Sequence, residues 1–192
     1  QEGEKSPVDG YELNLSCPNV DKGGMAFGTE PDLVERITRK VRRLTRRALV
    51  VKLSPNVTDI AQIALAAEAG KADAVSCINT VVGMAIDVKT CKPLIARGIG
   101  GLSGPAIRPI GVACVWKAAR AVRIPVIGLG GITCADDALE YLLAGASAIQ
   151  VGTAIFSNPR APLEILDGIK AWMRERNIGT LGEIPALLRF PS

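Results

Sequence analysis

The feature that most constrains this chain is a regular alternation between short apolar runs and longer segments with helical periodicity. The apolar runs are dense in Val, Ile, Leu and Ala, as expected for parallel strands covered on both faces. They comprise residues 11–15, 49–53, 74–78, 126–129 and 148–151. The helical segments comprise residues 31–45, 58–69, 105–122, 133–144 and 159–176. This alternation predicts an α/β fold built from right-handed strand–helix–strand units.

Residues that commonly cap helices stand at both ends of two helical segments. Thr58 and Thr133 stand where a side-chain hydroxyl can accept a hydrogen bond from the first helical turn. Gly70 and Gly145 follow the last turns, where glycine commonly ends a helix. The sequence contains no linker, low-complexity stretch or clear repeat, so residues 1–192 are predicted to form a single domain.

Polar residues and glycines gather at the carboxyl ends of all five predicted strands. The stretches are NLSCPN at 14–19, KLSPN at 52–56, INT at 78–80, GLGGI at 128–132 and VGTA at 151–154. A doubly wound sheet and a (β/α)8 barrel both fit the alternation. In a barrel these ends converge on one mouth, and no G-x-G-x-x-G motif follows the first strand to support a dinucleotide fold. We therefore predict an incomplete (β/α)8 barrel with about five of eight units, the N-terminal units being absent before residue 1.

Composition restricts the compartment and the chemistry. The chain is 48% hydrophobic and 22% charged, and no apolar run is long enough for a membrane span. Its 5 cysteines lack C-x-x-C spacing, which argues against a disulfide framework or a metal site, so we expect a cytoplasmic protein without a metal. Because His is absent, proton transfer must use Cys, Lys, Asp, Glu or Tyr.

Much of the net charge of +4 comes from residues 36–47, which are rich in Lys and Arg. Leu33, Ile37, Val41 and Leu44 recur at helical spacing through this stretch, which indicates an amphipathic helix with a solvated basic face. Nucleic-acid binding is the alternative. No aromatic residues interleave the charges for stacking on bases, so we expect no nucleic-acid partner.

Three glycine-containing stretches, residues 100–105, 130–131 and 152–153, stand between a strand and a helix. Glycine lets the backbone approach an anion, and the free N–H groups at a helix start favour phosphate. Each stretch alone could be an ordinary tight turn. Together they indicate a ligand that carries a phosphate.

Cys17 follows the first strand and is flanked by Asn14 and Asn19. A partly ionised thiol can act as a base, and the two amides can bind a polar planar ligand. The alternative is a small packed residue without a chemical role.

Lys52 stands near the end of a buried apolar run, where a charge is costly unless it faces a ligand or a partner. The alternative is that its side chain extends to solvent. Asn79 and Thr80 end the next strand and add neutral donors and acceptors at the same mouth.

In combination, these motifs resemble the class 1 dihydroorotate dehydrogenases. The stretches that carry the resemblance are NLSCPN at 14–19, KGGMAFG at 22–28, VKLSPNV at 51–57, INTVVGMAID at 78–87, GGLSGPAI at 100–107, GLGGI at 128–132 and QVGTA at 150–154. The resemblance runs in order from residue 11 to about residue 175 and corresponds to the C-terminal part of the family's chain. Residues 83–104 resemble the class 1B, NAD-linked catalytic subunit most.

The resemblance implies a barrel that uses FMN to oxidise (S)-dihydroorotate to orotate in the synthesis of pyrimidines (UMP). It makes Cys17 the base that takes a proton from C5, while the hydride from C6 passes to FMN. The implied substrate-binding residues are Asn14, Asn19, Asn79 and Thr80. The implied FMN-binding residues are Asn14, Lys52, Ile78, Gly104, Gly130, Gly131, Gly152 and Thr153.

The resemblance also implies partners. A class 1B catalytic subunit forms a homodimer within a heterotetramer and passes its electrons through a second subunit, which carries FAD and a 2Fe-2S cluster, to NAD. The cysteines here lack cluster spacing, so the cluster belongs on that partner. Alternatives are a class 1A, fumarate-linked enzyme, another Cys-base flavin barrel such as dihydropyrimidine dehydrogenase or dihydrouridine synthase, and an inactive fragment. The family's earlier strands, with a second lysine and an Asn-rich loop, have no counterpart here.

Overall fold

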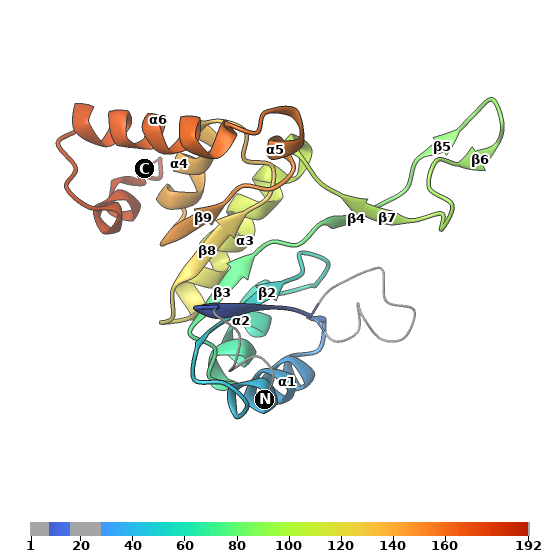
Figure 1. The fold of residues 1–192 in the computed structure, drawn as a ribbon, viewed down its shortest axis with the longest axis horizontal. Coiled ribbons are helices and arrows are strands. Elements are labelled where there is room, and N and C mark those ends of the chain that lie inside the picture. Colours follow the sequence, from blue (N-terminus) through green and yellow to red (C-terminus); the bar gives the residue numbers. More distant parts are fainter. Residues whose placement is uncertain (1–7, 16–27, 192) are drawn as a thin grey trace.

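The structure is a computed structural model that describes residues 8–15 and 28–191. Its centre is a parallel sheet of five strands in the order β1-β2-β3-β8-β9, which is also their order in the chain (Figure 1). The strands are β1 (Gly10–Asn14), β2 (Ala48–Leu53), β3 (Ala74–Cys77), β8 (Val126–Leu129) and β9 (Ala148–Gln150). Each predicted strand is confirmed to within one residue at either end.

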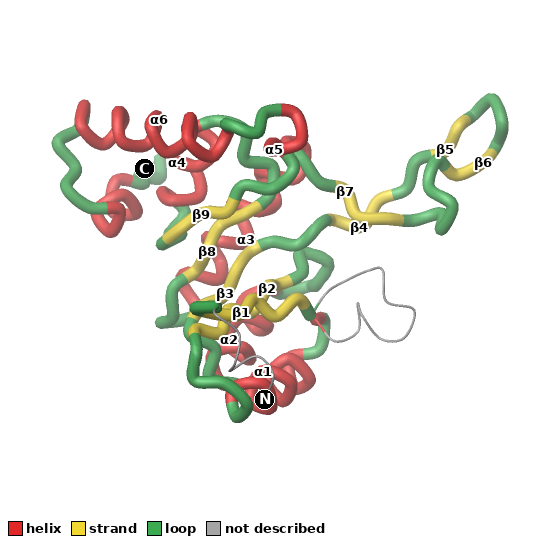
Figure 2. The backbone as a smooth tube through the Cα atoms, in the orientation of Figure 1, coloured by secondary structure: helices red, strands yellow, loops and turns green. Residues whose placement is uncertain are grey.

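The helices that follow the strands form an outer layer on the sheet (Figure 2). They are α1 (Pro31–Arg42), α2 (Ile60–Ala69), α3 (Arg108–Ala121), α4 (Ala135–Leu143), the single turn α5 (Ala154–Ser157) and α6 (Ala161–Glu175). The part of the chain that the structure describes also contains the 3-10 helices η3 (Pro105–Ile107) and η4 (Leu181–Leu187). Successive helices pack on one another, α1 on α2, α2 on α3, α3 on α4 and α4 on α6. This is the layering of a (β/α)8 barrel wall.

The sheet is curled, and its inner face is concave. Leu49, Val51 and Leu53 of β2 are buried, whereas Val50 and Lys52, which alternate with them, are only half-buried on the opposite face. Side chains of β1 and β9, the two edges of the sheet, meet across that inner face through a hydrogen bond of 2.8 Å. The sheet nevertheless remains open, because β1 and β9 are not paired.

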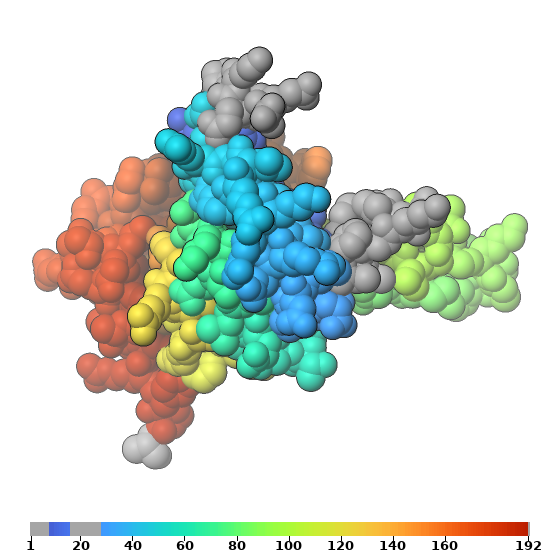
Figure 3. All heavy atoms as spheres, turned by 90° about the horizontal axis from the view of Figure 1, so that it is seen from below, coloured from blue at the N-terminus to red at the C-terminus, as the bar shows by residue number. Residues whose placement is uncertain are grey.

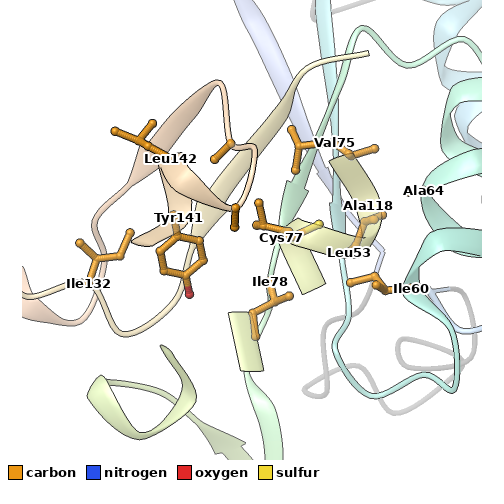
Figure 4. Close-up of a cluster of buried hydrophobic side chains, with 14 of the residues drawn as sticks. Leu53, Ile60, Ala64, Val75, Cys77, Ile78, Ala118, Ile132, Tyr141 and Leu142 are labelled. Carbon is orange, nitrogen blue, oxygen red and sulfur yellow. The ribbon is translucent and has the colours of Figure 1, made fainter. Parts of the chain in front are cut away.

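The hydrophobic core lies between the sheet and the helices (Figure 4). Val75 and Cys77 of β3 are fully buried, as are Ala118 of α3 and Tyr141 of α4. Each large apolar side chain that is buried in this way stabilises the fold by about 1.5–3 kcal/mol relative to exposure. The core therefore fixes the strand ends, which carry the candidate site.

Two helices begin at other residues than the sequence analysis predicted. Thr58 does not cap α2, because the carboxylate of Asp59 accepts the Ala61 N–H at 3.0 Å and the helix begins one residue later. Thr133 does not cap α4 either, because the capping position is Cys134. At α2 the Asp59 carboxylate takes the N–H that the Thr58 hydroxyl could have bonded, and at α4 the Thr133 hydroxyl donates to the Asp137 carboxylate instead of accepting from the helix.

The helix ends also differ from the prediction in detail. Helix α1 stops at Arg42 rather than at residue 45, and the guanidinium of Arg42 then bonds the carbonyl of Thr45. Gly70 ends α2 with a φ of −70°, so left-handed backbone is not the reason for glycine there. A Cβ at Gly70 would lie 2.6 Å from Thr38 Cβ, which shows that glycine allows α2 to pack closely on α1.

Three arginines of α1 and of the turn after it bond residues in other parts of the chain. Arg42 forms an ion pair of 2.6 Å with Asp73, and Arg39 bonds the carbonyl of Ala69. Arg47 bonds the carbonyl of Val8. These arginines therefore have structural roles at the amino end of the sheet.

Residues 81–102 form an arm that the sequence analysis did not predict (Figures 1 and 3). Its two antiparallel pairs are β4 (Val81–Gly83) with β7 (Gly100–Leu102), and β5 (Ile86–Asp87) with β6 (Lys92–Pro93). Strands of two or three residues carry too short a pattern to be recognised from sequence. In the described part of the chain, no helix is both long enough and apolar enough to cross a membrane.

Candidate functional site

A pocket of ≈ 300 Å³ opens at the carboxyl ends of the strands. Its walls are Lys52, Ile78, Asn79, Thr80, Ser103, Gly104, Pro105, Ile107, Leu129, Gly130, Gly131, Ile132, Thr133, Gly152, Thr153, Ala154 and Ser157. Apart from Asn14, every residue predicted to bind the cofactor lines this pocket, as do Asn79 and Thr80. Cys17 and Asn19 lie outside the described residues. The structure thus brings together residues that are up to about a hundred positions apart in the sequence.

Asn14 reaches the pocket through Asn79, whose amide donates a hydrogen bond of 3.0 Å to Asn14 Oδ1. The backbone N–H of Asn79 bonds the carbonyl of Leu53 at 2.8 Å, which fixes the strand end. Asn56 adds a second support, because its amide donates to the Thr80 carbonyl at 3.0 Å. The strand ends of β1, β2 and β3 are therefore cross-linked by asparagine side chains.

Glycine turns form the opposite wall. Gly104 and Gly131 have φ values of +88° and +72°, which L side chains rarely adopt. A Cβ on Gly131 would lie 2.6 Å from the Gly104 carbonyl oxygen, so the two turns pack directly against each other. A Cβ on Gly104 or on Gly152 would meet nothing within 4 Å. Those two positions therefore leave open space beside bare backbone, which is the cradle that a phosphate or ribityl chain requires.

A buried tyrosine supports the Gly130–Gly131 turn from below. The Tyr141 hydroxyl donates a hydrogen bond of 2.6 Å to the Gly130 carbonyl. Burial, followed by the neighbouring Cys114, raises the pKa of Tyr141, so the hydroxyl keeps its proton and remains a donor. Gly128 makes room for the ring, since a Cβ there would lie 2.6 Å from Tyr141 Cδ1. Sequence reasoning missed this support, for which Gly128 and Gly111, two glycines that make room for the tyrosine, were the sequence signals.

A cluster of one carboxylate, one threonine and one arginine fixes the turn that follows Gly131. The Asp137 carboxylate accepts hydrogen bonds from the Thr133 N–H at 2.8 Å and the Thr133 hydroxyl at 2.6 Å, and it forms an ion pair with Arg108. Burial alone would raise the pKa of Asp137. The hydrogen bonds from Thr133 and the Arg108 charge outweigh that effect and hold the pKa below its usual value. The cluster therefore locks the start of α4, where Thr133 lines the pocket.

Lys52 is the cation of the pocket, and its side chain is 22% exposed. In the part of the pocket that the structure describes, the other polar side chains are neutral amides and hydroxyls, and no carboxylate or thiol lines the wall. Cys77 precedes Ile78 but does not serve as a base, because burial, followed by Cys114, raises the pKa of its thiol. The described walls can therefore bind and orient a polar, phosphate-bearing molecule, and they offer no carboxylate or thiol as a proton acceptor.

Comparison with known proteins gives consistent matches. The family model described as dihydroorotate dehydrogenase matches residues 5–173. The chain is 53% identical over 177 residues to the dihydroorotate dehydrogenase B (NAD(+)) catalytic subunit of Alkaliphilus oremlandii, covering 92% of this chain and 59% of that protein. It is 53% identical over 182 residues to the protein of the same name from Thermoanaerobacter sp. strain X514, covering 95% and 60%. The chain thus spans about three fifths of the length of these curated relatives.

The fold also matches a solved structure, that of DHODH in complex with ferulenol from Eimeria tenella. The TM-score is 0.75 at 24% sequence identity, over 92% of this chain and 53% of that one. At this identity the likeness concerns the fold alone. It confirms the predicted α/β class and the (β/α)8 arrangement, of which the five strands form an open part.

Proposed function

The chain belongs to the dihydroorotate dehydrogenase family, and on that premise we propose that it provides the flavin site of an enzyme that oxidises (S)-dihydroorotate to orotate in pyrimidine synthesis. One observation carries the proposal. A single pocket at the carboxyl ends of the strands gathers the lysine, the amides and the bare glycine turns that the family resemblance assigns to FMN and substrate. Parallel barrels place their active sites at this end of the sheet.

The residues present fit FMN. The open space at Gly104 and Gly152 leaves room for the ribityl chain and the phosphate beside the backbone. Gly130, Gly131 and Thr153 complete the proposed phosphate cradle. Apolar walls such as Ile78 suit the faces of a planar ring, and a mostly apolar pocket with a few polar groups is typical of cofactor sites.

In the proposed reaction, each site residue has its own role. When bound, FMN supplies the acceptor for the hydride that leaves C6 of dihydroorotate. Cys17, which lies outside the described residues, accepts the proton from C5 as a thiolate, and the described walls offer no carboxylate or thiol for that function. Asn14, Asn19, Asn79 and Thr80 hold the polar groups of the substrate. Lys52 places a positive charge where reduction of the flavin develops negative charge.

We also propose an electron-transfer partner. Relatives at 53% identity are named catalytic subunits of an NAD(+)-linked enzyme, and a catalytic subunit implies at least one other subunit. The proposed partner carries FAD and a 2Fe-2S cluster and delivers the electrons to NAD, and the catalytic subunits pair as a homodimer within a heterotetramer. The chain's own 5 cysteines lack the spacing that a cluster needs, which supports a cluster on the partner.

The test begins with the full-length protein, purified alone and with the partner subunit. The purified catalytic subunit is expected to be yellow and to release FMN on denaturation, and dihydroorotate added without oxygen should bleach the flavin. NAD reduction should require the partner. Efficient fumarate reduction by the catalytic subunit alone would instead indicate the class 1A reaction, and a flavin that dihydroorotate does not bleach would contradict the proposed substrate.

A further inference from the structure

A carboxylate on the inner face of the sheet lies next to the lysine of the pocket. Glu12 belongs to β1 and Lys52 to β2, and the Lys52 Nζ lies 4.0 Å from Glu12 Oε1. Lys52 lines the pocket, whereas Glu12 is not among its walls. We infer that Glu12 is a positioning residue, which holds the Lys52 ammonium at the place where it meets the flavin. This inference rests on the proposed function.

Strand register puts the two side chains on one face. Val51 and Leu53 are buried against the helices, so Lys52 between them points to the inner, concave face. Asn14 is the register partner of Lys52, and Glu12, two residues earlier on the same strand, faces the same way. The pairing of Glu12 with Lys52 is therefore a diagonal contact between neighbouring strands.

The carboxylate of Glu12 is fixed by hydrogen bonds from two other strands of the sheet. Its Oε2 atom accepts hydrogen bonds from Ser76 Oγ on β3 at 3.0 Å and from Gln150 Nε2 on β9 at 2.8 Å. Ser76 is fully buried, so its hydroxyl has a fixed place. Both neutral donors bind Oε2, and Oε1 remains the oxygen nearest to Lys52. Donors from two strands, β3 and β9, thus hold one anion in a fixed orientation.

A lysine needs such a partner if its charge is to have a defined position. Its four-carbon side chain has many rotamers, and the ammonium is strongly attracted to water. Lys52 is 22% exposed, so solvent is within its reach. A charge that is already in place stabilises developing negative charge more than one that must first be ordered. Glu12 therefore acts on the flavin through Lys52 rather than by contact.

The experiment measures the midpoint potential of FMN bound to the full-length protein, by anaerobic spectroelectrochemical titration. Four forms are compared: the unmodified protein, Glu12→Gln, Lys52→Met and the double variant. A mobile ammonium stabilises the reduced flavin less, so Glu12→Gln is expected to lower the potential in the same direction as Lys52→Met. Because Glu12 acts through Lys52, the double variant is expected to have the same potential as Lys52→Met alone.

The sign and the additivity of the shifts decide between explanations. If the carboxylate acted only through its own field, its removal would raise the potential in both backgrounds. If Glu12 were only a packing residue, the potential of Glu12→Gln would equal that of the unmodified protein. Either result would overturn the inference. Asp73→Asn is the matched control, because Asp73 is a paired carboxylate at the amino end of the same sheet, and its loss should leave the potential unchanged.

Two further outcomes are covered. If Glu12→Gln does not fold, Ser76→Ala removes one anchor of Oε2 and keeps the carboxylate, and it should lower the potential by a smaller amount. An unshifted potential in Ser76→Ala would then count against the inference. Absence of FMN from the unmodified protein contradicts the proposed function and this inference with it. Normal FMN with an unshifted potential in Glu12→Gln contradicts the role of Glu12 alone.

Discussion

Three glycines of the pocket permit a graded test of the glycine cradle. Gly131 combines a left-handed backbone with a close neighbour, since its φ is +72° and a Cβ would lie 2.6 Å from the Gly104 carbonyl oxygen. Gly104 has the left-handed backbone alone, with a φ of +88° and nothing within 4 Å of a Cβ. Gly152 has neither constraint. Alanine at each position therefore separates backbone strain from collision.

The expected magnitudes follow from these differences. Left-handed backbone costs an L residue about 1–2 kcal/mol, and forcing an atom into a packed contact costs about 1–3 kcal/mol. Gly131→Ala should therefore lower the free energy of unfolding by about 2–5 kcal/mol. Gly104→Ala should lower it by about 1 kcal/mol, since the reduced entropy of the unfolded chain offsets part of the strain. Gly152→Ala should be neutral or stabilise the fold by up to about 1 kcal/mol.

The assay is urea unfolding of the flavin-free protein, so that ligand binding does not contribute to stability. FMN affinity is then measured by quenching of flavin fluorescence. Gly152→Ala should weaken FMN binding despite its normal stability, because the new methyl group enters the open space of the pocket. Equal unfolding midpoints for Gly131→Ala and Gly152→Ala would refute the packing argument, and unchanged FMN affinity in Gly152→Ala would refute the cradle.

Three more predictions concern other parts of the chain. Cys17→Ala should keep FMN but slow flavin reduction by dihydroorotate by about 10²-fold or more, and stopped-flow bleaching at the unmodified rate would show that Cys17 is not the base. Because the folded pKa of Asp137 is lowered, the stability that its ionised form contributes is present above the unfolded pKa of about 3.9 and is lost as the pH falls through the folded value. Urea titrations from neutral to acid pH should therefore show a shallower acid loss in Asp137→Asn. Asp59→Ala should cost about 1 kcal/mol, the usual value of an N-cap, and an unchanged melting temperature would contradict that capping role.

The sheet was predictable because its signal is local. Each strand is a short run of Val, Ile, Leu and Ala bounded by glycine or polar residues, and in a parallel sheet such runs are read directly from the sequence. The shared position of Lys52, Asn79, Gly130 and Gly152 was predictable for a related reason. Parallel strands place all their carboxyl ends at one edge, so residues that follow strands must meet.

The parts that were missed depend on long-range contacts. The bond between Glu12 and Gln150 joins residues 138 positions apart, and only the curvature of the sheet reveals it. The hydroxyl of Tyr141 beneath Gly130 is likewise set by how α4 packs on β8. Thr133 was assigned as a cap, but its hydroxyl donates to the Asp137 carboxylate instead of accepting from the helix, and residue preference alone does not reveal this pairing. Tertiary packing decided each of these points.

The measurement that tests the central claim most directly is a crystal structure of the full-length protein as purified, with its flavin. The account predicts FMN in the pocket at the carboxyl ends of the strands, with its phosphate against Gly130, Gly131, Gly152 and Thr153 and its ring beside Lys52. A flavin bound outside this pocket, or one whose phosphate lies away from the glycine turns, would contradict it.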